Sequence, residues 1–276
     1  MRKFIAALFS VGMIATLALG VVTAPAGADT SNGTVYVVHA IPGVTVDVYV
    51  NGKDTLPGFT PGTVAGPLSL PAGSYEIKVF KAGADPTTAT AVIDSTVNLP
   101  AGANVSLVAG LNASGTPTLF TFVNNVSAAA AGKGRLAVAH TAAAPAVDVL
   151  AGGSPVFTDL VNGKEDTADL AAGTVSASVV ATGTTTPVLI GPANVTVTAG
   201  DLTVVYAEGA PASGTTASTL GVVTQTIPLA GSAVGVPTGT GGLLDHHGTP
   251  VWAVAVLIVA GLGLSASAFS LARSRA

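Results

Sequence analysis

A regular alternation of apolar and polar residues marks several short segments of the chain. Between residues 44 and 50, Val alternates with Thr, Asp and Tyr, and a similar alternation runs from 74 to 80. A period of two is typical of a strand with one buried and one exposed face. Asn51-Gly52 follows the first of these segments and favours a tight hairpin turn. The pattern therefore predicts hairpins of short strands.

The same criteria predict further strands in the first half of the chain, and Pro57, Gly58, Pro61 and Gly62 predict an irregular connection among them. Seven or eight short strands about ten residues apart, with no helical segment, are typical of a sandwich or a small barrel. The predicted strands cover residues 34–40, 44–50, 68–70, 74–80, 90–99, 104–111 and 118–124.

The chain also resembles itself at a fixed spacing. Residues 35–40 resemble 136–141, and the next matching segments lie at offsets between 98 and 101. In both copies a His is followed eight positions later by an Asp. A period of about 100 residues indicates a duplicated domain rather than a solenoid.

The N-terminus is typical of a secretory signal peptide. Arg2 and Lys3 precede an apolar run over residues 4–22, and Ala26 and Ala28 are small residues suited to a cleavage site. We expect cleavage after Ala28. The alternative is an uncleaved N-terminal anchor.

The C-terminus predicts a transmembrane helix. Residues 251–272 carry no charge, and 22 residues of helix span about 33 Å, enough for a hydrocarbon core. Trp252 lies at one boundary, and Arg273 and Arg275 follow the other. These arginines favour a cytoplasmic C-terminus and an extracellular N-terminal region. The alternative is a buried core helix.

These observations predict an all-β protein of two tandem immunoglobulin-like β-sandwich domains, with an N-terminal signal peptide and one C-terminal transmembrane helix. Localisation is expected at the cell membrane as a single-pass protein. The expected parts are a signal peptide at 1–28, a first repeat at 29–127, a linker at 128–134, a second repeat at 135–227, a Gly/Pro/Thr-rich stalk at 228–250, the helix at 251–272 and a tail at 273–276.

Composition excludes several classes of chemistry. The absence of cysteine excludes a disulfide framework, a thiolate nucleophile, a thiolate metal site and a lipidated cysteine. Four of the ten basic residues lie in the two ends, so the predicted ectodomain has a net charge of −8. So few basic residues give no footprint for nucleic acid.

The motifs resemble a known family. Residues 37–42, 46–52 and 70–79 carry Val-Val-His-Ala-x-Pro, Val-Asp-Val-Tyr-Val-Asn-Gly and Leu-Pro-Ala-Gly-Ser-Tyr-Glu-Ile-Lys-Val. This sequence resembles a secreted bacterial domain known as domain-of-unknown-function family 4397, in two tandem copies, the second matching more loosely. The resemblance implies a β-sandwich at the cell surface. It implies no reaction.

The recurring pairs His39/Asp47 and His140/Asp148 invite a catalytic or metal role. One His and one Asp per copy supply at most two ligands, whereas a structural zinc site takes four. We therefore expect a structural role, in which the His binds an Asp or a backbone carbonyl and fixes a strand crossing.

Other candidate motifs are weak. The chain has no Gly-x-Ser-x-Gly nucleophile elbow. A two-carboxylate glycosidase stays open, although Asp54, Asp85, Glu165 and Asp166 fall at expected turns.

Two motifs lie in the predicted stalk. Asp245-His246-His247 could bind a metal or respond to pH, but an ordinary linker is the preferred interpretation. The segment 236–241 partly resembles a cell-wall sorting signal without its Leu-Pro-x-Thr-Gly motif, so attachment to the cell wall is an alternative.

Taken together, the sequence predicts a non-enzymatic surface protein acting in adhesion, envelope organisation or ligand binding, with no catalytic residues, cofactor or metal. Its expected partners are the membrane, through the C-terminal helix, and an unknown extracellular or cell-wall ligand. The alternatives are an enzyme acting on envelope polysaccharide and a carbohydrate-binding module. Aromatic residues make up only 5% of the chain, which disfavours the latter.

Overall fold

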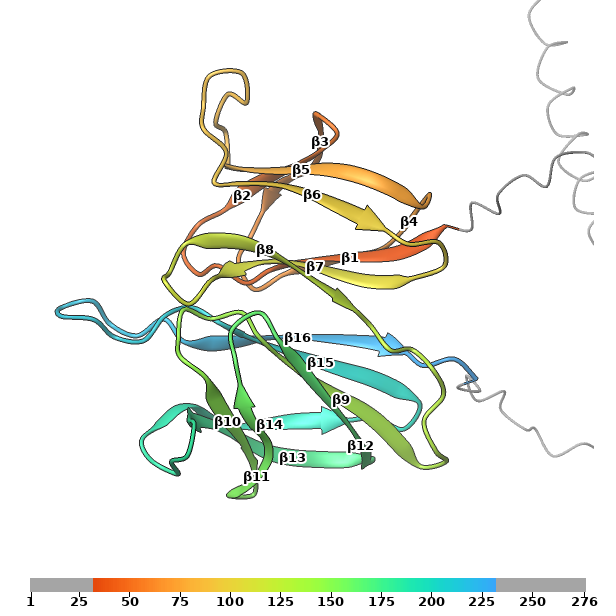
Figure 1. Ribbon diagram of the computed structural model, residues 1–276, viewed down its shortest axis with the longest axis vertical. Helices are drawn as coiled ribbons and strands as arrows, with labels where there is room; N and C mark the ends of the chain where they lie inside the picture. The colour runs from red at the N-terminus through yellow and green to blue at the C-terminus, as the bar shows by residue number, and fades with distance from the viewer. Residues whose placement is uncertain (1–31, 232–276) are drawn as a thin grey trace, which may run out of the picture. The chain divides into compact units, whose positions relative to one another are not determined.

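The computed structural model describes residues 32–231, which form sixteen β-strands (Figure 1). Within this range no helix is long and apolar enough to cross a membrane. The predicted signal peptide and transmembrane helix lie outside the described residues. The strands are β1 Gly33–His39, β2 Val46–Val50, β3 Lys53–Phe59, β4 Val64–Leu70, β5 Gly73–Lys81, β6 Ile93–Leu99, β7 Asn104–Leu111, β8 Pro117–Val123, β9 Lys133–His140, β10 Val147–Ala151, β11 Ser154–Leu160, β12 Glu165–Ala171, β13 Gly173–Ala181, β14 Val188–Val197, β15 Asp201–Glu208 and β16 Gly221–Pro228.

The strands form two repeats of the same topology. Repeat 1 (β1–β8) has one sheet of order β4-β1-β7-β8 and one of order β3-β2-β5-β6. Repeat 2 (β9–β16) has sheets of order β12-β9-β15-β16 and β11-β10-β13-β14, which is the same arrangement shifted by eight strands. Most neighbours are antiparallel, but β1 pairs with β7, and β9 with β15, in parallel. The all-β sandwich predicted from the alternation is therefore confirmed.

The turn chemistry explains the first hairpin of each repeat. Asn51 and Gly52 have φ values of 49° and 77°, and Gly152 and Gly153 have 56° and 85°. Two consecutive positive φ values match the twist of a two-residue hairpin, and Asn and Gly tolerate them best. The two repeats thus reach the same turn with different residues.

Some element boundaries differ from those expected. The Pro- and Gly-containing segment predicted to be irregular begins inside β3, which ends at Phe59. β4 is longer than the three residues predicted. Lys133 and Gly134, assigned to the linker, are the first residues of β9. Pro228, assigned to the stalk, ends β16, and Leu229 is buried. The rest of the predicted stalk lies outside the described residues.

Each repeat has a core of its own between its two sheets. In repeat 1 the core contains Val35, Val48, Val79 and Leu107, and in repeat 2 it contains Leu136, Val149, Val179 and Val205. The alternation of the strands sends every second side chain into this space.

A third core joins the repeats. Tyr36, Val38 and Phe122 of repeat 1 form one hydrophobic cluster with Val204 and Tyr206 of repeat 2. These side chains lie on the faces of β1, β8 and β15 that point away from the repeats' own cores, and Figure 1 shows the sheets of β1-β7-β8 and β9-β15-β16 facing each other. Both inner sheets are therefore buried on both faces, which explains the nearly continuous burial of β7, β9 and β15.

A buried hydrogen bond joins the two repeats across this shared core. The Ser106 hydroxyl of repeat 1 donates to Gln225 Oε1 of repeat 2 at 3.2 Å, and the Tyr206 hydroxyl donates to the same oxygen at 2.8 Å. Buried hydrogen bonds of this kind fix the register of an otherwise apolar contact.

Candidate functional site

The repeated histidines act as backbone clamps. His39 Nε2 lies 2.7 Å from the carbonyl oxygen of Val44, and the N–H of Ile41 donates to Nδ1 at 3.3 Å. A carbonyl only accepts, so Nε2 carries the proton and the ring is neutral. Burial lowers the pKa of His39, although the bond to Val44 partly offsets this effect. His39 thus closes the bend between β1 and β2.

His140 occupies the same position in repeat 2. Its Nε2 donates to the carbonyl oxygen of Pro145 at 2.9 Å, and burial lowers its pKa. Both rings are almost fully buried, and burial lowers the pKa of each. Each is therefore a structural histidine bound to a backbone carbonyl.

The repeated aspartates also bind the backbone. Asp47 accepts hydrogen bonds from the N–H groups of Gly58 (2.7 Å) and Gly83 (2.8 Å). Asp148 accepts from the N–H groups of Asp159 and Gly183, both at 2.8 Å, and these two bonds lower its pKa. Each carboxylate ties the edge strand of its outer sheet, β3 or β11, and one loop to the neighbouring strand β2 or β10.

The paired His and Asp residues therefore do not form a joint site. In the described part of the chain, each binds backbone groups rather than the other. Residues 32–231 also contain no cluster of three or more His, Asp or Glu side chains that could hold a metal ion. Asp245-His246-His247 and the segment 236–241 lie outside the described residues.

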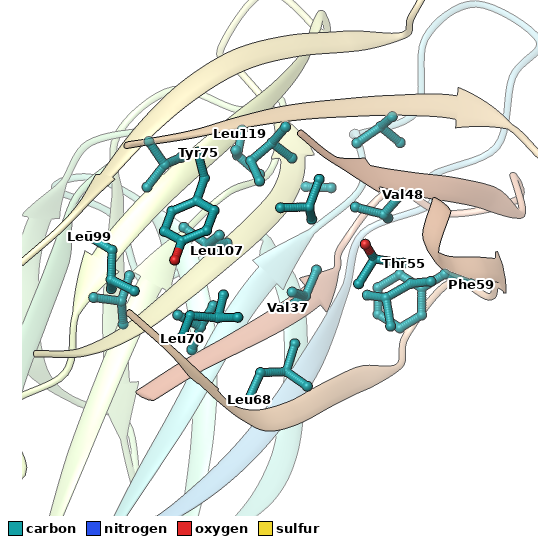
Figure 2. Close-up of a pocket in the computed structure, with 18 of the residues that line it drawn as sticks. Val37, Val48, Thr55, Phe59, Leu68, Leu70, Tyr75, Leu99, Leu107 and Leu119 are labelled. Carbon is teal, nitrogen blue, oxygen red and sulfur yellow. The ribbon is translucent and has the colours of Figure 1, made fainter. Parts of the chain in front are cut away.

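A cavity of about 280 Å³ lies inside repeat 1, between its two sheets. Its walls are almost entirely aliphatic and aromatic, and they come from all eight strands of repeat 1 (Figure 2). Figure 2 shows Leu68 and Leu70 on one side and Thr55 and Phe59 on another, all directed toward the same space. This space is the repeat 1 cavity.

The repeat 1 cavity opens at one side of the sandwich. β3 and β4 are the edge strands of the two sheets, and they lie on the same side. Their cavity-lining residues Leu56, Phe59, Leu68 and Leu70 are only half-buried. At the opposite side β6 contacts β8 and closes the sandwich. A ligand can therefore reach the apolar interior between the edge strands.

Repeat 2 packs the equivalent edge of its core more tightly, since Phe157 and Leu160 are buried where Leu56 and Phe59 are only half-buried. Its β14 is ten residues long, whereas β6 has seven, and Leu189 and Ile190 at its start pack against the repeat 2 core. β14 also contacts β9 and β15 across the sandwich. Phe157 takes the position of Leu56, since Phe157 pairs with Val149 as Leu56 pairs with the equivalent Val48. The pocket found in repeat 2 holds only about 10 Å³.

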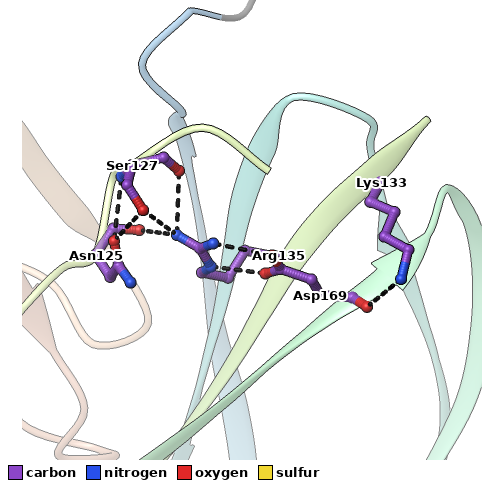
Figure 3. A network of polar contacts seen from close by, with 5 residues as sticks. All are labelled: Asn125, Ser127, Lys133, Arg135 and Asp169. Atoms are coloured by element: carbon purple, nitrogen blue, oxygen red, sulfur yellow. Dashed lines mark hydrogen bonds and ion pairs between the residues drawn. The ribbon is translucent and has the colours of Figure 1, made fainter. Parts of the chain in front are cut away.

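Arg135 fastens the connection between the repeats. Its guanidinium donates from Nε and Nη2 to the two carboxylate oxygens of Asp169, at 2.7 and 2.9 Å (Figure 3). Its Nη1 donates to the carbonyl oxygens of Asn125 and Ser127, at 2.9 and 3.1 Å. This bidentate pair lowers the pKa of Asp169. One side chain of repeat 2 thus binds the segment that leaves repeat 1.

The family comparison agrees with the resemblance over part of the chain. Residues 33–150 match the model of a family described as "Domain of unknown function (DUF4397)". The matched segment runs from β1 to β10, so it covers repeat 1 and the beginning of repeat 2. No protein with a curated description matches the chain.

Proposed function

We propose that this is a non-enzymatic, exported protein held at the cell surface, in which repeat 1 binds a small apolar ligand. The repeat 1 cavity carries the proposal. Ligand sites are typically concave, mostly apolar and few per protein, with volumes from about 300 Å³ upward. A cavity of about 280 Å³ lined by aliphatic side chains is close to that range.

The surface location rests on the sequence at the two ends. A signal peptide at 1–28 and an apolar helix at 251–272 followed by arginines would place the two repeats outside the membrane. The cell wall is the alternative site of attachment.

We further propose that repeat 2 is a second, diverged copy of the same immunoglobulin-like family domain. Support comes from the shared strand order and from the recurrence of His39 and Asp47 as His140 and Asp148. With its interior filled, repeat 2 would serve as the support on which repeat 1 is displayed.

A cavity-filling substitution tests the binding function. In the wild-type chain, a soluble neutral ligand such as 1-octanol should raise the melting temperature measured by calorimetry. At a hundredfold excess over its dissociation constant the rise should be roughly 5–10 °C. Leu56→Trp should place an indole in the cavity, leave the chain folded and abolish the rise.

Phe157→Trp is the matched control, since the same position in repeat 2 faces a filled core. This variant should lose stability because a well-packed core has no room for a larger ring. It should keep the octanol response. An equal response in wild type and Leu56→Trp would refute binding in the repeat 1 cavity.

A further inference from the structure

The repeat 1 cavity has a single charged residue in its wall. Lys53 lies at the start of β3, and the other polar groups are Thr55 and Tyr75. The Tyr75 hydroxyl already donates to the carbonyl oxygen of Pro71 at 2.7 Å, and that of Thr55 to the carbonyl oxygen of Lys53. Lys53 is therefore the polar group best placed to select a ligand.

Among residues 32–231, no carboxylate forms an ion pair with the ammonium of Lys53. In the described part of the chain the ion pairs join Lys78 to Glu76 and Asp94, and Arg135 to Asp169. Lys53 is exposed at the side where β3 and β4 leave the cavity open. An anionic group at this opening would meet a positive charge that no carboxylate neutralises.

The cavity volume sets the size of the apolar part. A methylene group takes up about as much space as a water molecule, whose share of liquid volume is about 30 Å³. A cavity of about 280 Å³ then holds a chain of roughly eight to ten carbons. This volume suits one chain rather than two.

Repeat 2 differs from repeat 1 both at the lysine position and in the packing of its interior. Pairing places Ser154 opposite Ala151, where Lys53 lies opposite Val50 in repeat 1, so the lysine position carries a hydroxyl. Phe157 and Leu160 of repeat 2 are buried, whereas the equivalent Leu56 and Phe59 of repeat 1 are only half-buried. The lysine and the large cavity thus occur in the same repeat.

We propose that repeat 1 binds a single-chain carboxylate of about eight to ten carbons, with its alkyl chain in the repeat 1 cavity and its carboxylate beside Lys53. This proposal names the ligand class for the binding function above and rests on it. The apolar walls bind the chain through burial, and Lys53 provides preference for an anion over a neutral or cationic head group.

Because the chain has no cysteine, a single introduced thiol reports on the cavity alone. Leu70→Cys places a thiol in the half-buried wall, and Thr96→Cys places one on the exposed face of the same repeat. Each full-length variant is treated with a small thiol reagent in the presence of octanoate, 1-octanol or octyltrimethylammonium. Octanoate should protect the Leu70→Cys thiol at a roughly fivefold lower concentration than octyltrimethylammonium. It should leave the Thr96→Cys thiol fully reactive.

Substitution of the lysine separates the two proposals. In the Leu70→Cys background, Lys53→Ser should remove the preference for octanoate, and Lys53→Glu should reverse it. If 1-octanol protects but octanoate is no better and Lys53→Ser changes nothing, the ligand class is wrong while the binding function stands. If none of the three compounds protects the cavity thiol, or all protect both thiols equally, both proposals fail.

Discussion

The buried polar side chains include two contrasting groups, those that bind the backbone and those with an atom that has no hydrogen-bond partner among the described residues. His39 and Asp47 belong to the first group, since each replaces water by hydrogen bonds to main-chain groups of neighbouring loops. Glu165 belongs to the second. Within the described residues its Oε2 is buried without a hydrogen-bond partner, as is that of Glu208.

Glu165 lies in the sheet of repeat 2 that faces repeat 1. It pairs with Ala139 of the shared core, whereas the matching residue of repeat 1, Val64, packs directly against that core. Burial, with a smaller contribution from the charge of Asp166, raises the pKa of Glu165 to about 7. The neutral acid is thus favoured in the folded protein.

The raised pKa predicts that the contribution of Glu165 to stability is larger in acid. Between pH 4.5 and about 7 the folded state binds more protons at Glu165 than the unfolded state does, so stability falls as pH rises through this window. A shift of this size corresponds to about 3 kcal/mol. Glu165→Gln should therefore stabilise the protein at pH 8 by up to this amount and have little effect at pH 4, as measured by chemical denaturation.

Asp54→Asn, at an exposed position of repeat 1, is the matched control for the loss of one carboxylate. A Glu165→Gln variant with the same stability difference at both pH values would contradict the assignment.

At the level of elements, the segment between β8 and β9 is held by the Arg135 side chain and by a backbone hydrogen bond rather than by strand pairing. Arg135 binds two of its carbonyl oxygens, and the N–H of Ala230 donates to the carbonyl oxygen of Val126 at 2.7 Å. The sequence marked this stretch as a linker because it is rich in Ala and Gly, and composition alone carries no information about a distant arginine.

Arg135→Lys should loosen this connection. Lysine keeps the charge but cannot make the bidentate pair with Asp169 and reach the two carbonyls at once. The expected loss of stability is about 2 kcal/mol, and limited proteolysis should cut residues 126–132 faster than in the wild type. Lys133→Ala serves as the control, because Lys133 makes only an exposed 3.4 Å contact to Asp169. Equal cleavage of the two variants would rule out Arg135 as the fastening residue.

The elements also show how far sequence reasoning reaches. The bounds predicted for β7 match those observed, although both of its faces are buried. Alternation located β5 closely, because its two faces differ in burial. It missed β3, where Pro57 and Gly58 suggested an irregular loop, since an edge strand tolerates such residues.

The repeat 1 cavity could not be predicted from the sequence. Both repeats carry the same alternation toward their interiors, yet only repeat 1 has the large cavity described above. The difference depends on the separation of the sheets and on where β14 begins, which are properties of packing rather than of pattern. The roles of His39 and Asp47, in contrast, follow from their recurrence and from the small number of ligands that they offer.

On the scale of the whole described region, the two repeats share a core and should unfold together. Separation would expose Tyr36 and Phe122 of repeat 1 and Tyr206 of repeat 2, all of which are at most 8% exposed. It would also break the hydrogen bond from Ser106 to Gln225. The two repeats are therefore better described as one folding unit of four sheets than as two independently folding domains joined by a linker.

Calorimetry of the full chain provides the test of this coupling. The wild type should show a single transition for both repeats, with equal calorimetric and van't Hoff enthalpies.

Val108→Asp places a charge in the shared core, because Val108 is fully buried and packs there rather than inside repeat 1. The cost of an unpaired buried charge, about 4 kcal/mol or more, should fall on both repeats and lower or split the transition. Two independent transitions in the wild type, or a Val108→Asp variant that melts as the wild type does, would show that the shared core does not couple the repeats. The strength of this coupling matters for the proposed binding site as well, since β1 and β7 line the repeat 1 cavity on one face and contact repeat 2 on the other.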